Sequence, residues 1–376
     1  MDFGLSEHQN ILKKSARDFL ARECPKKLVR EMFDDEKGYP PQLWKRIADL
    51  GWVGMVFPEE YDGGGGDFLD LTVLLEEMGR ACLPGPFLST VIAGMIILEA
   101  GNENQKRKLL PKIAAGESIV TLAITESSAL YTPEGINATA IAEEQDYIMS
   151  GTKLFVPDAH VADCLICVVR TEDSCAKGGG ITLFLVDSKS TGISCNPLLT
   201  MAGNKEFEVL LDKVSVPQGN MLGELGQGWE VVESVLRKAA VAKCAEMVGA
   251  AHQALELTVD YVKERVQFGR PVGSFQAVQH HCANMLIALE GARFLTYEAA
   301  WLISENLPHA KEVAMAKAWA SDACNKVVLL AHQCTGGVSL MEDHDMPLYT
   351  RRIKQDETTY GDADFHREFL ACELGL

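Results

Sequence analysis

The sequence predicts a multidomain α+β protein in which one β block lies between two helical blocks. Residues 1–118 carry apolar side chains spaced about 3.6 residues apart, the period of an amphipathic helix. Residues 119–226 contain short β-prone runs separated by turn residues, which is typical of a barrel or sandwich. Residues 227–376 return to the helical period in alanine-rich segments. We therefore predict an N-terminal helical domain, a middle β domain and a C-terminal helical domain with these bounds.

The N-terminal block shows the helical period most clearly at its start. The apolar residues that recur there are Leu5, Ile11, Leu12, Phe19 and Leu20. The tetraglycine Gly63–Gly66 interrupts the block, and we expect a loop there because glycine holds neither a helix nor a strand well. This loop lacks the strand, the lysine and the Ser or Thr of a phosphate-binding loop, so we interpret it as a plain connector.

The middle and C-terminal blocks differ in the length of their segments. The predicted strands are SIVTLAIT, DYIMSG, TKLFV, DCLICVVR, ITLFLVD and EVLLDKVSV, and their spacing favours antiparallel pairing. The predicted helices that follow cover about residues 229–265, 274–305, 310–334 and 347–374. The two helical blocks have the lengths expected of parts of one bundle.

The composition limits what the protein binds and where it resides. The 35 basic and 53 acidic residues give a net charge of −18, which repels nucleic acid and anionic membrane surfaces. The N-terminus is charged where a signal peptide is apolar, and the longest apolar run, Val91–Leu98, is far shorter than the roughly 20 residues of a membrane span. The 11 scattered cysteines fit a reducing compartment. We expect a cytoplasmic protein without a nucleic-acid or membrane partner.

Several common site motifs are missing or incomplete. Cys164 and Cys167 form a C-x-x-C in a predicted strand, where they point to opposite faces and no second pair accompanies them. His280 and His281 are adjacent on a predicted helix and therefore diverge, so we predict no metal site. The sequence has no G-x-S-x-G, G-x-G-x-x-G or Walker A motif, which argues against a serine hydrolase, a Rossmann dehydrogenase and a P-loop NTPase.

Three breaks between the C-terminal helices carry groups that suit a nucleotide. In the first, Arg265 and Arg270 flank an aromatic residue, and orphan amides beside fixed cations favour a diphosphate. In the second, the pair Gly336–Gly337 allows the backbone to approach a ligand closely. The third carries the carboxylates of Asp362 and Asp364, which are potential acceptors for ribose or adenine. Each break is also compatible with a solvated turn, but together they predict a nucleotide cofactor.

These stretches, in this order, resemble the acyl-CoA dehydrogenase family of flavoproteins over essentially the whole chain. The matching segments are MDFGLSEHQNIL, LGWVGMVFPEEYDGGGG, TLAITES, ERVQFGRPVGSFQ, HQCTGGVSL and YTRRIKQDETTYGDADFHRE. The resemblance implies a C-terminal four-helix bundle, FAD as cofactor, an acyl-CoA substrate and a tetramer of tight dimers. It also implies electron-transferring flavoprotein as the electron acceptor.

The resemblance further implies positions for the cofactor. The residues implied as FAD contacts are Thr125, Arg265, Phe268, Gln276, Gln333, Gly336, Gly337, Asp362 and Asp364. Arg265 corresponds to the arginine that reaches the FAD diphosphate of the neighbouring subunit. The glycine pair corresponds to the Q-x-x-G-G turn beneath the same cofactor. Asp362 and Asp364 stand where the family has a threonine and a glutamine near the adenine.

The segments implied to face the flavin ring and the substrate depart from the family pattern. Thr125 and Glu126 keep the family's T-E, but SSALYTPEG follows and puts Tyr131 where a serine usually meets the acyl-CoA. Phe155–Ala159 replaces the family's W-I-T-N-G, and Pro157 stands for a threonine whose hydroxyl serves flavin N5. Because proline donates no hydrogen bond, one bond to the ring is missing.

The catalytic base is the largest departure. Dehydrogenation requires a carboxylate at the substrate α-carbon. Tyr360 occupies one of the two family positions for this glutamate and Ala239 occupies the other, while Ala240 replaces a neighbouring arginine. Tyrosine is a poor base because its ordinary pKa is about 10. The acidic residues that could substitute are Glu233, Glu246, Asp356, Glu357 and Asp362.

The sequence therefore predicts an FAD-dependent acyl-CoA dehydrogenase, or a subunit of one, that desaturates an acyl-CoA thioester between its α and β carbons. The departures favour a hetero-oligomer in which a related chain supplies the base, with a bulky or dicarboxylic acyl group as substrate. Two alternatives stay open. One is a homologue that performs a non-oxidative elimination on an acyl-CoA, and the other is a non-catalytic subunit that completes a partner's FAD site.

Overall fold

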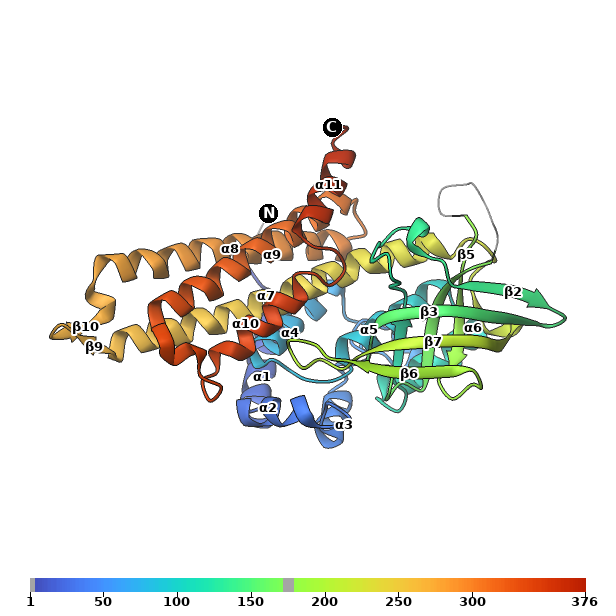
Figure 1. The fold of residues 1–376 in the computed structure, drawn as a ribbon, viewed down its shortest axis with the longest axis horizontal. Coiled ribbons are helices and arrows are strands. Elements are labelled where there is room, and N and C mark those ends of the chain that lie inside the picture. Colours follow the sequence, from blue (N-terminus) through green and yellow to red (C-terminus); the bar gives the residue numbers. More distant parts are fainter. Residues whose placement is uncertain (1–3, 172–178) are drawn as a thin grey trace. The chain divides into compact units, whose positions relative to one another are not determined.

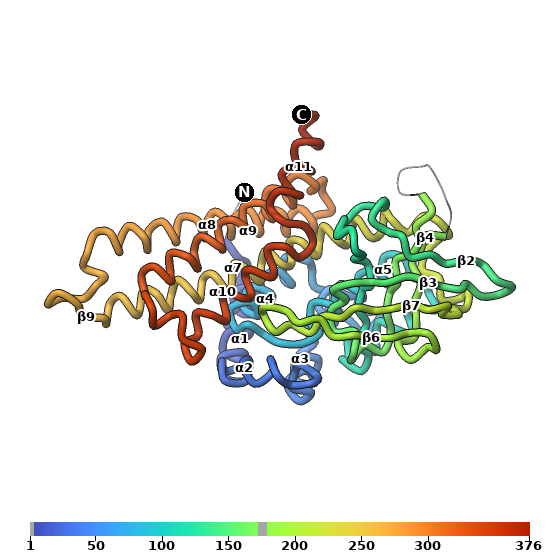
Figure 2. Tube along the Cα trace, in the orientation of Figure 1, coloured from blue at the N-terminus to red at the C-terminus, as the bar shows by residue number. Residues whose placement is uncertain are grey.

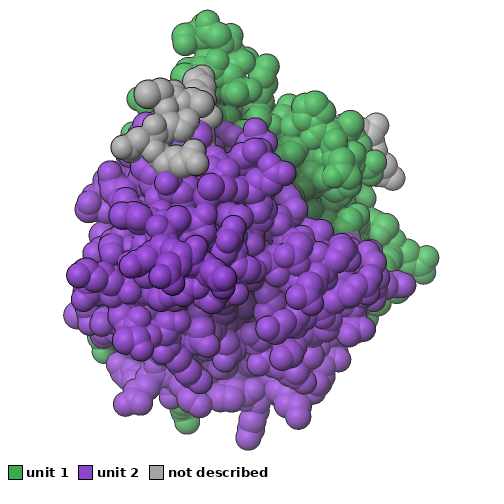
Figure 3. Space-filling view, turned by 90° about the vertical axis from the view of Figure 1, so that its right-hand side faces the viewer, with its two compact units in different colours: residues 1–31, 67–83, 237–376 green, residues 32–66, 84–236 purple. Residues whose placement is uncertain are grey.

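The computed structural model describes residues 4–171 and 179–376, drawn as a ribbon in Figure 1 and as a Cα trace in Figure 2. The chain forms two compact units (Figure 3). Unit 1 consists of residues 1–31, 67–83 and 237–376, and unit 2 of residues 32–66 and 84–236. The N-terminal helical segment thus contributes to both units. The predicted domain bounds after residues 118 and 226 stay a prediction, and the first domain's residues 1–3 lie outside the described residues.

Unit 1 is helical. Its helices are α1 (Glu7–Glu23), the start of α2 (Lys26–Asp34), α4 (Phe68–Ala81), most of α7 (Gly228–Glu264), α8 (Gln276–Ser304), α9 (Ala310–Thr335), α10 (Met346–Asp356) and α11 (Ala363–Glu373). Helices α8 and α9 run antiparallel along one another (Figure 1). The single helix predicted near residues 347–374 is wrong, because a turn at residues 357–362 divides it. Gly361 adopts φ +94° there, a conformation that side chains other than glycine rarely adopt.

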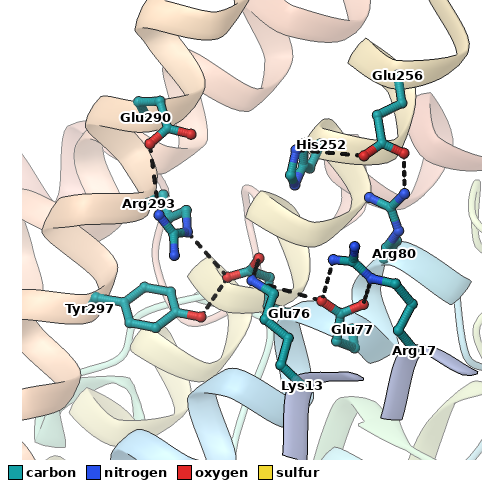
Figure 4. Close-up of polar contacts among 10 residues, drawn as sticks. All are labelled: Lys13, Arg17, Glu76, Glu77, Arg80, His252, Glu256, Glu290, Arg293 and Tyr297. Carbon is teal, nitrogen blue, oxygen red and sulfur yellow. Dashed lines mark hydrogen bonds and ion pairs between the residues drawn. The ribbon is translucent and has the colours of Figure 1, made fainter. Parts of the chain in front are cut away.

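A buried ion network fixes α1 and α4 to the C-terminal helices (Figure 4). Lys13 Nζ on α1 lies 2.6 Å from Glu76 Oε1 on α4, and Tyr297 on α8 donates to Glu76 Oε2 at 2.6 Å. Arg17 binds Glu77 through two hydrogen bonds of 2.9 and 2.8 Å. Burial alone would raise the pKa of Glu76, but Lys13 and Tyr297 outweigh it and the pKa is lowered. The network ties segments far apart in sequence into one unit.

Unit 2 combines a sheet with helices. The helices are α3 (Pro41–Asp49), α5 (Phe87–Ala100) and α6 (Glu103–Ala114). The strands are β1 (Val120–Ala123), β2 (Thr139–Glu143), β3 (Asp146–Pro157), β4 (Cys164–Arg170), β5 (Ile181–Asp187), β6 (Ile193–Leu198), β7 (Glu206–Pro217) and β8 (Met221–Leu222). Their order in the sheet is β6-β7-β3-β2-β4-β5-β8, with β1 beside β4.

The sheet is mixed rather than wholly antiparallel, which corrects the pairing that the strand spacing favoured. Most neighbouring strands are antiparallel, but β1 and β2 each pair with β4 in parallel. Alternation and turn spacing reveal that a strand exists, whereas its partner and direction depend on contacts distant in sequence. Among the described residues, no helix has both the length and the apolar character needed to cross a membrane.

Candidate cofactor and substrate site

The first break is a β-hairpin that presents a strained phenylalanine. Strands β9 (Val266–Gln267) and β10 (Arg270–Pro271) pair, and the turn residues Phe268 and Gly269 have φ of +52° and +78°. Such turns favour Asn-Gly, because both residues need positive φ. The Phe268 side chain is nonetheless 92% exposed. A bulky apolar residue held in this conformation in water is unfavourable for folding, which points to a binding role.

The two arginines of this break have different surroundings. The Arg270 guanidinium lies over the Phe275 ring at 4.1 Å, so it is engaged within the hairpin. Arg265 is exposed, and no ion pair of its side chain occurs within the described residues. Val272 donates its amide to the Arg265 carbonyl at 2.8 Å, which fixes the backbone from which the arginine projects. Gln276 begins α8, is exposed, and follows Phe275, which offers no side-chain cap to the first-turn amides.

The second break is a glycine turn at the end of α9. Gly336 adopts φ +67° and ψ −154°, a combination essentially restricted to glycine. Gly337 has no such requirement, and an added Cβ would meet no atom of the chain within 4 Å. Gln333 is exposed one helical turn earlier. The chain's own packing therefore does not explain Gly337, whereas close approach of an outside group to the backbone does.

The first two breaks lie at the same end of unit 1. Helices α8 and α9 pack against one another, and the Cys282 thiol on α8 lies close enough to the Cys334 thiol on α9 to affect its pKa, so the start of α8 lies beside the end of α9. Figure 2 shows the same arrangement, with the β9 hairpin near this end. An exposed arginine, uncapped helix amides and an open glycine backbone suit a dinucleotide diphosphate, and in this respect the residues fit FAD.

The third break has clear structural roles. Asp362 caps α11, and its Oδ1 accepts from the Phe365 amide at 2.9 Å. Asp364 Oδ1 accepts from Arg367 Nη1 at 2.9 Å. Both carboxylates thus already have partners inside the chain. Their contact with an adenine stays a prediction.

The turn that carries Tyr360 is held from two sides. Tyr360 adopts φ +60°, and its carbonyl accepts from His366 Nε2 at 2.9 Å. Lys317 Nζ, fully buried on α9, donates to the carbonyls of Glu357 and Gly361 at 2.7 Å each. Burial lowers the pKa of Lys317 to about 8. Lys317 is not among the residues predicted from the sequence, although a lysine on the apolar face of an alanine-rich helix was a usable signal.

Most acidic residues that could replace the base are occupied. Ala239 on α7 is buried, and one turn further along Lys243 Nζ binds Asp356 at 3.0 Å and Glu246 at 2.8 Å. Burial disfavours the charge on Lys243, but Asp356 and Glu246 nevertheless raise its pKa. Glu357 pairs with Lys354. Each of these carboxylates stabilises a lysine instead of standing ready as a base.

In unit 2, Glu126 of the T-E pair has a structural role. Glu126 Oε1 accepts from buried Lys153 Nζ at 2.7 Å, and the Glu126 carboxylate also accepts the amides of Asn137 at 2.9 Å and Ala138 at 3.0 Å. The bonds to the two amides close the loop that runs from Glu126 to Asn137. Tyr131 lies half-buried in that loop, and its contact with substrate stays a prediction.

The segment that replaces W-I-T-N-G lies beside this pair. Leu154 donates its amide to the Thr125 carbonyl at 2.8 Å. A register shift in β3 follows, where Phe155 has φ +51° and is 54% exposed. Asp158, with φ +56°, is buried and accepts from Ser89 Oγ at 2.7 Å. An exposed aromatic in a strained conformation is again a feature that a flat ligand would explain.

Comparison with known proteins decides the family. Profiles of the acyl-CoA dehydrogenase N-terminal, middle and C-terminal domains match residues 6–117, 121–214 and 226–375. The chain belongs to the acyl-CoA dehydrogenase family. It is an oxidoreductase that acts on acyl-CoA thioesters with FAD as cofactor.

Individual relatives of this family cover the whole chain. An NADH-dependent acryloyl-CoA reductase from Anaerotignum propionicum is 32% identical, over 100% of this chain and 96% of the relative. Butyryl-CoA dehydrogenase from Megasphaera elsdenii is 29% identical, with full coverage of both chains and a TM-score of 0.93. The ChsE4–ChsE5 complex from Mycobacterium tuberculosis contains a chain that is 25% identical, with 100% and 99% coverage and a TM-score of 0.91.

Proposed function

We propose that this chain is a subunit of an acyl-CoA dehydrogenase assembly that binds FAD but does not supply the catalytic carboxylate. The observation that carries the proposal is the contrast between Gly337, which is open to an approaching ligand, and Ala239 and Tyr360, which stand where the family's base is expected. A related subunit would supply the base. The ChsE4–ChsE5 complex supports this organisation, because it joins two named proteins and contains a chain of this fold.

The roles of the chain's own residues follow from their exposure and chemistry. Arg265 would neutralise the FAD diphosphate, the Gly336–Gly337 turn would offer it backbone contacts, and Phe268 would pack against the cofactor. Bound FAD would accept the hydride that leaves the substrate β-carbon. The Glu126–Lys153 pair would keep the substrate loop in place without touching the reacting atoms. A bulky or dicarboxylic acyl group is the proposed substrate, and electron-transferring flavoprotein the proposed acceptor.

Purification with and without the product of a neighbouring gene tests the proposal. We expect little turnover with an artificial electron acceptor for the chain alone and full turnover for the assembly. Full flavin and full activity in the chain alone would contradict the proposal. Arg265→Gln should lower the flavin-to-protein ratio, whereas the matched control Arg270→Gln, from the arginine stacked on Phe275, should not.

A second candidate runs the reaction in the reductive direction. The acryloyl-CoA reductase is a relative that adds hydrogen to an acyl-CoA. Reduction requires a proton for the α-carbon, and a tyrosine with an ordinary pKa of about 10 is protonated at neutral pH. If Tyr360 is this donor, then Tyr360→Phe abolishes reduction of an enoyl-CoA by a reduced artificial donor. Mass spectrometry of the product separates both candidates from a non-oxidative elimination. Dehydrogenation removes two hydrogens from the acyl group and reduction adds two, whereas an elimination removes a different group.

A further inference from the structure

His332 occupies the last turn of α9, directly before the Gly336–Gly337 turn. Its two ring nitrogens both have partners: Nδ1 lies 2.8 Å from Ser339 Oγ and Nε2 lies 2.8 Å from Thr350 Oγ1. Ser339 lies in the 3₁₀ turn that follows α9 (Gly336–Leu340) and is fully buried, and Thr350 lies on α10. One side chain therefore joins the end of α9, the glycine turn and the next helix.

A count of protons assigns the direction of each bond. Ser339 Oγ donates its single proton to the Gly336 carbonyl at 2.7 Å. Ser339 must then accept from His332, so Nδ1 carries a proton. Burial lowers the pKa of His332, so the ring is neutral at pH 7 and Nε2 accepts from Thr350. With a neutral ring only one of the two hydroxyls can keep its bond to a carbonyl. The Ser339 bond to Gly336, at 2.7 Å, is shorter than the Thr350 bond to Met346, at 3.1 Å, so Thr350 is the hydroxyl that donates to the ring instead.

The bonds form a chain from the imidazole to the peptide that a diphosphate would meet. The Nδ1 proton orients Ser339, and Ser339 orients the carbonyl of Gly336. Rotation of the Gly336–Gly337 peptide would break the buried serine's bond, and an unpaired buried hydroxyl is costly. The Gly337 amide, which belongs to this peptide, is therefore held in one direction before a ligand arrives.

We propose that His332 is a positioning residue for FAD: through its Nδ1 proton and Ser339, it fixes the orientation of the Gly336–Gly337 peptide that receives the diphosphate. The proposal rests on the proposed role of this turn in holding FAD. His332 itself touches neither cofactor nor substrate. Its contribution is to remove the freedom that the peptide would otherwise lose on binding.

Two amide substitutions separate the ring nitrogens. In His332→Asn the amide nitrogen stands near the place of Nδ1 and can still donate to Ser339. In His332→Gln the amide stands near the place of Nε2, keeps Thr350 and leaves Ser339 without its donor. The experiment uses the full chain with any co-purifying subunit, and measures the FAD dissociation constant after removal and re-addition of FAD. Thermal unfolding of the apoprotein shows that each variant is folded.

We expect His332→Gln to weaken FAD binding roughly fivefold to tenfold and His332→Asn to bind within about twofold of the wild type. Ser339→Ala should weaken binding as much as His332→Gln, and the double variant no further, because both act through one bond. Equal FAD affinity of the Asn and Gln variants, whether weak or unchanged, would overturn the proposal. A His332→Gln variant with a lowered unfolding temperature but unchanged FAD affinity would also overturn the proposal.

The variant Gly337→Val distinguishes two errors: a wrong role for His332 and a wrong location of the diphosphate site. An added Cβ at this position meets no atom of the chain within 4 Å, so we expect the variant to fold normally and to lose FAD if the diphosphate binds there. If Gly337→Val binds FAD normally, the turn is not the diphosphate site and the proposed function is at fault. If it loses FAD while both His332 variants bind normally, only the role of His332 is refuted.

Discussion

The segments proposed to bind the FAD diphosphate, in unit 1, and those proposed to face the flavin ring, in unit 2, differ in which residues match the family pattern. In unit 1 the exposed residues, Arg265 and Gly337, match the family, although Gly337 is not required by packing. In unit 2 Glu126, which matches the family, forms a buried pair with Lys153, whereas the positions proposed to face the ligand carry residues such as Pro157. On the proposed assignment, cofactor recognition and proton transfer would depend on separate residues, and a chain could retain the first while the second changes.

The largest expected effect comes from placing a carboxylate at position 360, where the resemblance to the family implies the catalytic base. Tyr360→Glu should raise dehydrogenation by the chain alone by about 10²–10⁴-fold, the usual contribution of a positioned general base. Steady-state turnover with an artificial acceptor measures it. Tyr360→Gln is the control, since it has a similar shape but cannot accept the proton. If the two variants are equally slow, position 360 does not meet the substrate.

The buried pair in unit 2 gives the next largest effect, on stability. Glu126→Gln leaves the fully buried Lys153 without a carboxylate partner, and should cost about 3–5 kcal/mol in the free energy of unfolding. Burial already lowers the pKa of Lys153, so its charge depends on this partner. Chemical denaturation measures the loss. The double variant Glu126→Gln with Lys153→Met should be more stable than Glu126→Gln alone, and a double variant that is less stable would contradict a purely structural role.

The smallest effect is expected for a substitution of Phe268, which should raise the stability of the apoprotein but lower its affinity for FAD. Phe268→Asn should stabilise the apoprotein by about 0.5 kcal/mol, because relief of roughly 1–2 kcal/mol of strain exceeds the roughly 0.5–1.5 kcal/mol of its edge contact with Phe275. The same variant should bind FAD more weakly. Differential scanning calorimetry and flavin titration provide the two values. A variant that is both less stable and equally good at binding FAD would show that Phe268 only packs the hairpin.

The sequence indicated the residues that we propose to bind the diphosphate, but few of the residues that hold them in place. The residues Arg265, Gly336 and Gly337 stood out because charge and glycine content are visible in a linear sequence. His332 and Lys317 did not stand out, since their partners Ser339, Thr350 and Gly361 are recognised only when helices pack together. Asp362, which the resemblance places near the adenine, caps α11 in the structure.

The sequence by itself determined the alternation of helical and β segments, the family and the absence of a carboxylate at two positions, because periodicity and residue identity are local properties. Only the tertiary structure decided that two strands pair with β4 in parallel, that the last helix is divided, and that most of the acidic residues near the vacant base position are bound to lysines or cap a helix. The strand pairing and the pair of Lys243 with Asp356 depend on which distant residues come together. In a desolvated space an unpaired charge is unfavourable, so the buried carboxylate of Asp356 is held by a partner.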